Sequence, residues 1–187
     1  KPYVDGNKVG KVIGITFDDG YQNNLINAAP VLKKYNFSAT CYLVNKKIGT
    51  SNTWDLEHGI SQRPLMTSDE IQDWIDLGMD IGAHSQTHAD LTKISEKQAR
   101  KEINDCKTEL EFFFKISVDD FCYPFGRFNE SVCNITRNAG YASATTMIRG
   151  KVNPKSNNFQ LPRIPITYHT LPHLFLLKIL SKYEDKR

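Results

Sequence analysis

Several features that mark common classes of protein are absent from this sequence. No apolar run approaches the roughly 20 residues of a membrane-spanning helix, so no membrane span is expected. The net charge is only +3, and lysine and arginine form no block longer than a pair. Nucleic acid is therefore not an expected partner. Neither of the glycine-rich phosphate-binding motifs occurs.

Cysteine is also scarce, and no pair has the Cys-x-x-Cys spacing of a metal or redox site. Cys41 and Cys122 lie in apolar, strand-like runs, where small buried thiols are common. We expect buried free thiols, and not disulfides or metal ligands, at all four positions, which are Cys41, Cys106, Cys122 and Cys133.

Strand-like runs and helical patterns alternate along a chain long enough for one domain, predicted over 1–187. The strand-like runs are 11–18, 38–44, 79–84, 120–124, 141–147 and 161–167. Helical patterns cover 22–35 and 67–77, the second of which opens with a Thr-x-x-Glu capping box. A long helix follows Ser95, with one buried face made of Ile103, Cys106, Leu110 and Phe113. Two more helices are expected, one from Glu130 to Gly140 and an ordinary packed helix from Leu171. Such alternation predicts a mostly parallel sheet with helices outside it. Because the polar clusters fall at strand C-terminal ends, a barrel or barrel-like α/β fold is favoured.

The first polar cluster is Asp18-Asp19, between an apolar strand and Gly20. Successive strand residues point to opposite faces, so both carboxylates cannot point inward while the strand stays regular. A turn at Gly20 relaxes this constraint, and one carboxylate can then bind a metal while its neighbour stays hydrogen-bonded nearby. The alternative is a plain turn whose aspartates cap the next helix.

The second cluster contains His84 and His88, four residues apart at the end of another apolar run. A helical turn after the strand would point both imidazoles the same way, as two metal ligands require. The alternative is a pair of half-exposed histidines. One carboxylate and two neutral histidines leave a divalent cation with residual charge and open positions, which suits catalysis. The same ligand set also occurs in non-haem iron oxygenases.

Three segments resemble the first three motifs of the polysaccharide deacetylases, which form carbohydrate esterase family 4. They are Thr16-Phe17-Asp18-Asp19-Gly20, Ile81–His88 and Phe121–Gly126. The segment 161–164 resembles one found in a branch that includes poly-N-acetylglucosamine deacetylases. The resemblance covers roughly 11–180 and implies a distorted (β/α) barrel of about seven parallel strands, with a metal site at their C-terminal ends.

The resemblance also implies roles for single residues. Asp19, His84 and His88 would bind a divalent metal, usually zinc, although cobalt or nickel can serve in the family. Asp18 would be the general base, and a backbone N–H near Phe125 would hold the oxyanion. The implied activity is hydrolytic removal of N-acetyl groups from amino sugars of a polysaccharide or glycoconjugate, which would be the partner.

The chain departs from the family pattern in several places. Cys122 stands where many members carry an arginine that orients the base, and Arg163 is our candidate replacement, with a structural arginine as the alternative. Phe125 replaces a common tyrosine. For the general acid, 171–173 has the expected Leu-x-His letters but opens a helix, so His169 is our candidate; an ordinary loop histidine is the alternative. The family's late tryptophan motif is missing.

Competing interpretations remain open at this point. A glycan-binding or scaffold domain would keep the metal site without catalysis, and a related enzyme would hydrolyse a non-sugar amide. The resemblance favours the cell envelope, periplasm or exterior, whereas free cysteines fit a reducing compartment such as the cytoplasm. Trp54, in the polar loop 45–65, is expected to be structural, although an aromatic there could stack on a sugar.

Overall fold

The six strands run parallel and pair with their neighbours in chain order, as strand–helix alternation predicts. This computed structural model describes residues 12–186. The strands are β1 (Thr16–Phe17), β2 (Thr40–Leu43), β3 (Asp80–Ala83), β4 (Asp120–Cys122), β5 (Ser143–Arg149) and β6 (Leu161–Arg163).

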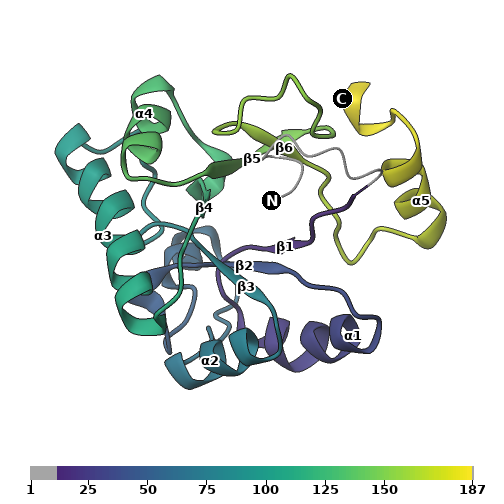
Figure 1. The fold of residues 1–187 in the computed structure, drawn as a ribbon, viewed down its shortest axis with the longest axis horizontal. Coiled ribbons are helices and arrows are strands. Elements are labelled where there is room, and N and C mark those ends of the chain that lie inside the picture. The colour runs from purple at the N-terminus through teal and green to yellow at the C-terminus, as the bar shows by residue number, and fades with distance from the viewer. Residues whose placement is uncertain (1–11, 187) are drawn as a thin grey trace.

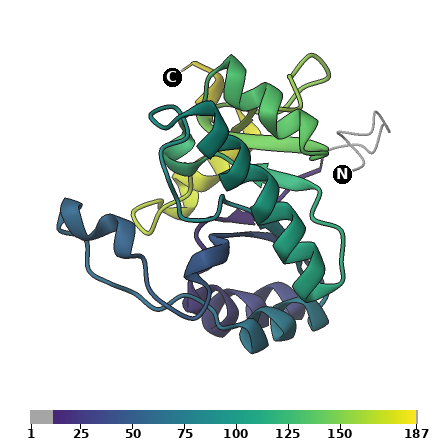
Figure 2. The same ribbon diagram turned by 90° about the vertical axis from the view of Figure 1, so that its left-hand side faces the viewer.

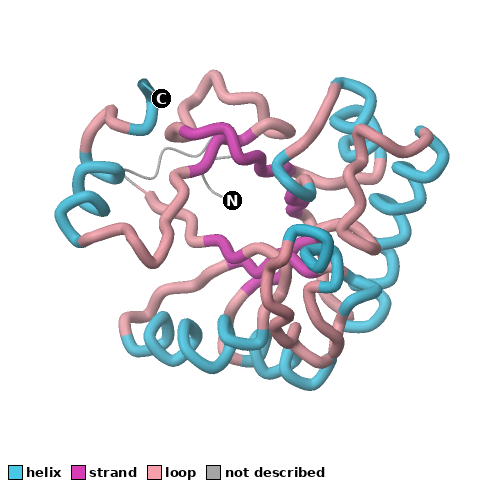
Figure 3. Tube along the Cα trace, turned by 180° about the vertical axis from the view of Figure 1, so that it is seen from behind, coloured by secondary structure: helices cyan, strands magenta, loops and turns pink. Residues whose placement is uncertain are grey.

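The sheet curls into an incomplete barrel with the helices on its outer side (Figure 1), and the tube view from behind shows the strands around a central opening (Figure 3). The barrel-like prediction is confirmed, but the expected number of about seven strands is one too many for the described residues. Each strand-like run forms one strand, and the last apolar run of the sequence is helical. β1 and β6 are therefore the two edges of the described sheet.

The helices follow the predicted pattern with shifted bounds. A π-helical stretch, η1 (Asn24–Ala28), leads into α1 (Ala29–Lys34), and the later helices are α2 (Ser68–Asp76), α3 (Glu96–Phe114), α4 (Glu130–Asn138) and α5 (Pro172–Leu180). Short 3-10 turns are η2 (Asn45–Lys47), η3 (Thr53–His58), η4 (Pro124–Gly126) and η5 (Glu184–Lys186). The capping box between Thr67 and Glu70 forms as predicted. The segment between β2 and α2 carries η2 and η3, and its later part, with η3, projects from the body in Figure 2.

The core lies between the sheet and its covering helices. α3 buries Ile103, Cys106 and Leu110 as predicted, but Phe114 and not Phe113 completes the face. Phe113 and Phe114 both fit the spacing of three or four residues after Leu110. In the folded protein Phe114 is buried, whereas Phe113 is 65% exposed and contacts the Phe112 ring. All four cysteines are buried and free, as predicted.

Two edges of the fold differ from the sequence-based expectation. β1 covers only Thr16–Phe17 of the predicted strand 11–18; Lys11 lies outside the described residues, and Ile13 is 64% exposed. The prediction of an ordinary packed α5 is wrong, because this helix is apolar on nearly all sides and meets the body on one. Its buried residue is Lys178, whose Nζ lies 2.9 Å from Glu184 Oε1 and donates to the Pro165 carbonyl at 2.6 Å. None of the helices in 12–186 has the length and apolar character needed to cross a membrane.

Candidate active site

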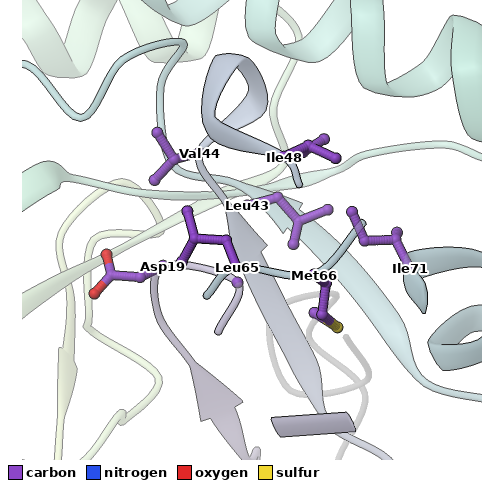
Figure 4. Close-up of a pocket in the computed structure, with 8 residues that line it drawn as sticks. Asp19, Leu43, Val44, Ile48, Leu65, Met66 and Ile71 are labelled. Carbon is purple, nitrogen blue, oxygen red and sulfur yellow. The ribbon is translucent and has the colours of Figure 1, made fainter. Parts of the chain in front are cut away.

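The turn after β1 separates two adjacent carboxylates. Asp19 adopts a left-handed backbone (φ 72°), and Gly20 follows with φ 79°. This φ favours glycine, and an added Cβ at Gly20 would also lie 2.9 Å from Leu43 Cδ2. Figure 4 shows the Asp19 carboxylate pointing away from the apolar side chains beside it, which include Leu43 and Leu65. The turn thus frees Asp18 and Asp19 to face different partners.

The two histidines follow β3 on a loop and not on a helical turn, which corrects that part of the prediction. Ser85 and His88 both have φ 64°, a left-handed backbone that brings the two rings together without a helix. The Ser85 hydroxyl accepts a hydrogen bond from the His88 N–H at 3.0 Å. Thr87 donates through its backbone and hydroxyl to Glu102 of α3, which ties the loop to the helix.

Asp19, His84 and His88 converge on one point. Asp19 Oδ1 lies 3.4 Å from His84 Nε2 and 3.3 Å from His88 Nε2, and the two rings meet edge to face. Both histidines are buried, and Asp19 Oδ1 is buried without a hydrogen-bond partner among the described residues. An orphaned carboxylate oxygen facing two imidazole nitrogens suits a divalent cation, because each atom offers a lone pair toward the same space.

The protonation states of these groups follow from their neighbours. Burial raises the pKa of Asp19, but the contacts with His84 and His88 lower it by more. The pKa of Asp19 therefore lies below its ordinary value, and this carboxylate stays charged. Burial keeps the pKa of His88 below its ordinary value. Burial also lowers the pKa of His84, but the neighbouring Cys122 and Asp19 outweigh it and raise the pKa. Since the Cys122 carbonyl 2.7 Å away can only accept, His84 Nδ1 carries a proton.

Asp18 faces a different partner, Arg163 at the end of β6. The guanidinium donates to both carboxylate oxygens, from Nη1 at 2.6 Å and from Nη2 at 2.8 Å. It also donates to the Thr146 carbonyl at 2.9 Å and to Thr16 Oγ1 at 3.3 Å, so Arg163 joins the two edge strands of the open barrel. Burial raises the pKa of Asp18, but the bond from Arg163 and the nearby His84 outweigh it, and the pKa lies below its ordinary value.

The third motif forms the η4 turn beside these groups. Phe125 has φ 58°, and its ring meets the His88 ring edge-on at 4.5 Å between centroids. Gly126 has φ 65°, and an added Cβ would lie 2.5 Å from Met147 Cβ, so only glycine fits. Positive φ at non-glycine residues is costly and gathers at functional sites, and here it occurs at Asp19, Ser85, His88 and Phe125.

The structure brings Arg163 into contact with Asp18, whereas His169 does not join the group. His169 is exposed on the loop after β6, with its ring against Tyr168. No hydrogen bond, ion pair or ring contact links His169 to the carboxylates or to the other histidines within residues 12–186. The sequence analysis expected Trp54 to be structural or to stack on a sugar, and it missed the contact that the structure shows, in which the Trp54 ring stacks on His88. The signal that could have found it was a tryptophan in an otherwise polar loop.

Comparison with known proteins agrees with this geometry. The family model described as "Polysaccharide deacetylase" matches residues 5–144. The chain belongs to this family. YxkH of Bacillus subtilis, named as a polysaccharide deacetylase, is 28% identical over 157 residues, covering 84% of this chain and 52% of that protein. Poly-beta-1,6-N-acetyl-D-glucosamine N-deacetylase of Staphylococcus aureus is 26% identical over 171 residues, covering 87% of this chain and 57% of that protein.

Among solved structures, the Streptococcus pyogenes deacetylase PplD in complex with acetate has a TM-score of 0.79 and 25% identity. That match covers 92% of this chain and 72% of PplD. The predicted family and its barrel-like fold are thus confirmed. This polysaccharide deacetylase chain spans about half the length of the curated relatives it matches.

Proposed function

We propose that this chain is a metal-dependent hydrolase that removes N-acetyl groups from amino sugars of a polysaccharide or glycoconjugate. The observation that carries the proposal is the division of two adjacent carboxylates. Asp19 Oδ1 faces both histidine Nε2 atoms at 3.3–3.4 Å, while Asp18 is held by two hydrogen bonds from Arg163. Family membership supports the reaction, and the orphaned Asp19 oxygen supports the metal.

Asp19, His84 and His88 are the residues that would hold the cation, with zinc as our first choice and cobalt or nickel as substitutes. Two imidazoles and one carboxylate match a catalytic zinc set that leaves open positions. A divalent cation held there supplies Lewis-acid polarisation of the acetamido carbonyl and lowers the pKa of water.

The protein's own groups perform the remaining steps. Asp18, unprotonated because of its low pKa, takes a proton from the attacking water as the water oxygen bonds to the carbonyl carbon. The backbone N–H at Phe125 donates to the developing oxyanion, a contribution of roughly 10²–10³ in rate. The C–N bond then breaks as a general acid, for which His169 is the sequence-based candidate, protonates the leaving nitrogen, and acetate and a free amino sugar are released.

Arg163 takes the part of the arginine that many members carry at the position of Cys122. Its two bonds to Asp18 fix the direction in which this carboxylate accepts a proton. Arg163 Nη2 lies 3.4 Å from Cys122 Sγ, so the guanidinium sits beside the position it replaces. The non-catalytic glycan-binding alternative assumes that the base has lost its orienting arginine, and this contact counts against that assumption.

Protonation of the leaving amine requires a general acid. His169 stays the sequence-based candidate for the acid, and no contact in 12–186 joins it to the site.

As first substrate we propose β-1,6-linked poly-N-acetylglucosamine, the polymer named for the Staphylococcus aureus relative.

The test is acetate release from metal-stripped protein refilled with zinc, cobalt or nickel. The substrates are β-1,6-linked and β-1,4-linked N-acetylglucosamine oligosaccharides, with a non-sugar N-acetyl amide for comparison. The proposal expects metal-dependent acetate release from a glycan and little from the simple amide. Zinc binding without acetate from any glycan would favour a binding domain, and hydrolysis of the simple amide alone would favour an amidase.

A further inference from the structure

The two candidate metal-binding histidines are oriented by different means. A metal-binding imidazole almost always donates its second N–H to a carboxylate, a carbonyl or water. His84 follows this rule, with Nδ1 2.7 Å from the Cys122 carbonyl oxygen. His88 Nδ1 is buried, and no residue in 12–186 forms a hydrogen bond with it. Among the described residues, the His88 ring is therefore oriented by the contact of its Nε2 with Asp19, 3.3 Å away, and otherwise by packing.

Two aromatic side chains enclose the His88 ring. Trp54 stacks on it with centroids 4.4 Å apart and an interplanar angle of 27°. Phe125 meets it edge-on, with centroids 4.5 Å apart and an angle of 66°. Stacked and edge-on contacts are the preferred geometries of aromatic pairs. A ring held in this way cannot flip unless one of its neighbours moves.

The segment that carries Trp54 is held by hydrogen bonds among its own residues. The flap, residues 51–64, is closed at its base by an antiparallel bridge between Ser51 and Pro64. Asn52 is buried, and its side chain accepts from the Arg63 N–H at 2.6 Å and donates to Asp55 Oδ2 at 2.8 Å. These bonds tie Asn52 to Arg63 at the far end of the flap and to the Asp55 side chain next to Trp54, although the flap projects from the body of the protein (Figure 2).

We infer that Trp54 is a positioning residue that fixes the His88 imidazole for metal binding, in place of the hydrogen bond that His84 has. The inference rests on the proposed metal site. It differs from a sugar-stacking role because the contact seen in the structure is made with a candidate ligand. Trp54 then acts on affinity for the metal, and only through the metal on turnover.

The test is the zinc affinity of wild type, Trp54→Ala, Trp54→Phe and Leu56→Ala, measured by competition with a chelator. Trp54→Ala should weaken zinc binding by roughly 10–100-fold, the usual cost of losing an outer-shell partner. Trp54→Phe keeps an aromatic face and should stay within about threefold of wild type. Leu56 lies in the same η3 turn but is 57% exposed, so Leu56→Ala is the matched control and should bind zinc normally.

A second readout on the zinc-free protein does not depend on affinity. NMR signals of the His88 ring should be sharp in wild type and broadened by exchange in Trp54→Ala. If Trp54→Ala does not fold, Asn52→Ala keeps the indole, frees the flap and should weaken zinc binding several-fold.

Wild-type zinc affinity in Trp54→Ala would overturn the inference. A raised KM for the acetylated oligosaccharide in that variant, with normal zinc affinity, would make Trp54 a substrate contact instead. If the affinities fall in the predicted order but no variant or wild type releases acetate, the proposed deacetylase function fails and the positioning role stands. A wild-type chain that binds no zinc contradicts both.

Discussion

The two carboxylates that end β1 are neighbours in sequence, yet their partners come from opposite parts of the sheet. Asp19 faces two imidazoles from the loop after β3, and Asp18 faces a guanidinium from β6, 145 residues away along the chain. Two left-handed residues at the turn, Asp19 and Gly20, separate them. The difference teaches that a single Asp-Asp pair can supply both a metal ligand and a base, provided that the backbone reverses between them.

The two sides also differ in what holds them. The Asp19 side is built from loop backbone with positive φ at Ser85 and His88, and it leaves a buried oxygen without a partner among the described residues. The Asp18 side is fully paired, because Arg163 satisfies both carboxylate oxygens and also bonds Thr16 across the open edge of the barrel. Variants on the first side should therefore change metal binding, and variants on the second should change turnover alone.

The largest expected effect is that of Asp19→Asn. The amide has no charge to offer a cation, so zinc affinity should fall by more than the roughly 100-fold that loss of an outer-shell partner costs, and acetate release should fall to background. Zinc titration and acetate assay on the same preparation measure both effects. The matched control is Asp80→Asn, at the opposite end of β3 from His84, which should leave both values unchanged. If Asp19→Asn keeps the zinc affinity of wild type, Asp19 is not a metal ligand and the contrast between the roles of Asp19 and Asp18 is wrong.

A smaller effect is expected on the other side, from Arg163→Lys. Lysine keeps the charge but cannot donate two parallel bonds to Asp18, so kcat should fall by about 10²-fold, within the range of a general-base contribution. Zinc affinity should stay within about threefold of wild type, because Arg163 makes no contact with Asp19 or either histidine. Parallel losses of zinc affinity and kcat in Arg163→Lys would mean that the two sides are not separate.

The smallest effect concerns the capping box of α2, outside both sides of the site. The hydrogen bond from the Thr67 N–H lowers the pKa of Glu70 in the folded protein. Because the pKa of Glu70 is lower in the folded than in the unfolded protein, its charge stabilises the fold at any pH above the unfolded-state pKa. This contribution is lost as the pH falls through the folded-state pKa. Glu70→Gln should thus cost about 0.5 kcal/mol of unfolding free energy at pH 7. Denaturant unfolding should show the cost shrinking once the pH drops below about 4. A cost that is the same at both pH values would argue against this linkage, and zinc affinity should not change.

The sequence predicted the strand–helix alternation and the residues that meet at the strand ends, because both depend on local patterns. The positions of Asp18, Asp19, His84 and His88 followed from where apolar runs stop. Arg163 was named as a candidate, but its two bonds to Asp18 depend on how far the sheet curls, which no local pattern encodes.

Other features depended on tertiary packing and were missed. Phe114 is buried and Phe113 is exposed because of the surface that α3 covers, which the sequence does not indicate. A run of apolar residues such as α5 likewise does not indicate which of its side chains stay exposed. The left-handed residues Ser85 and His88 replaced the expected helical turn, since non-glycine residues give little sequence warning of positive φ. The contact of Trp54 with His88 joins residues 34 positions apart, and no local pattern predicts it.

The most direct test of the division of labour is Asp18→Asn, assayed for bound zinc and for acetate release from the best glycan substrate. The asparagine cannot accept a proton, while Asp19, His84 and His88 remain unchanged. The account predicts wild-type zinc content together with acetate release reduced by about 10²–10⁴-fold. Near-normal acetate release, or loss of zinc together with activity, would contradict the separate roles assigned to the two carboxylates.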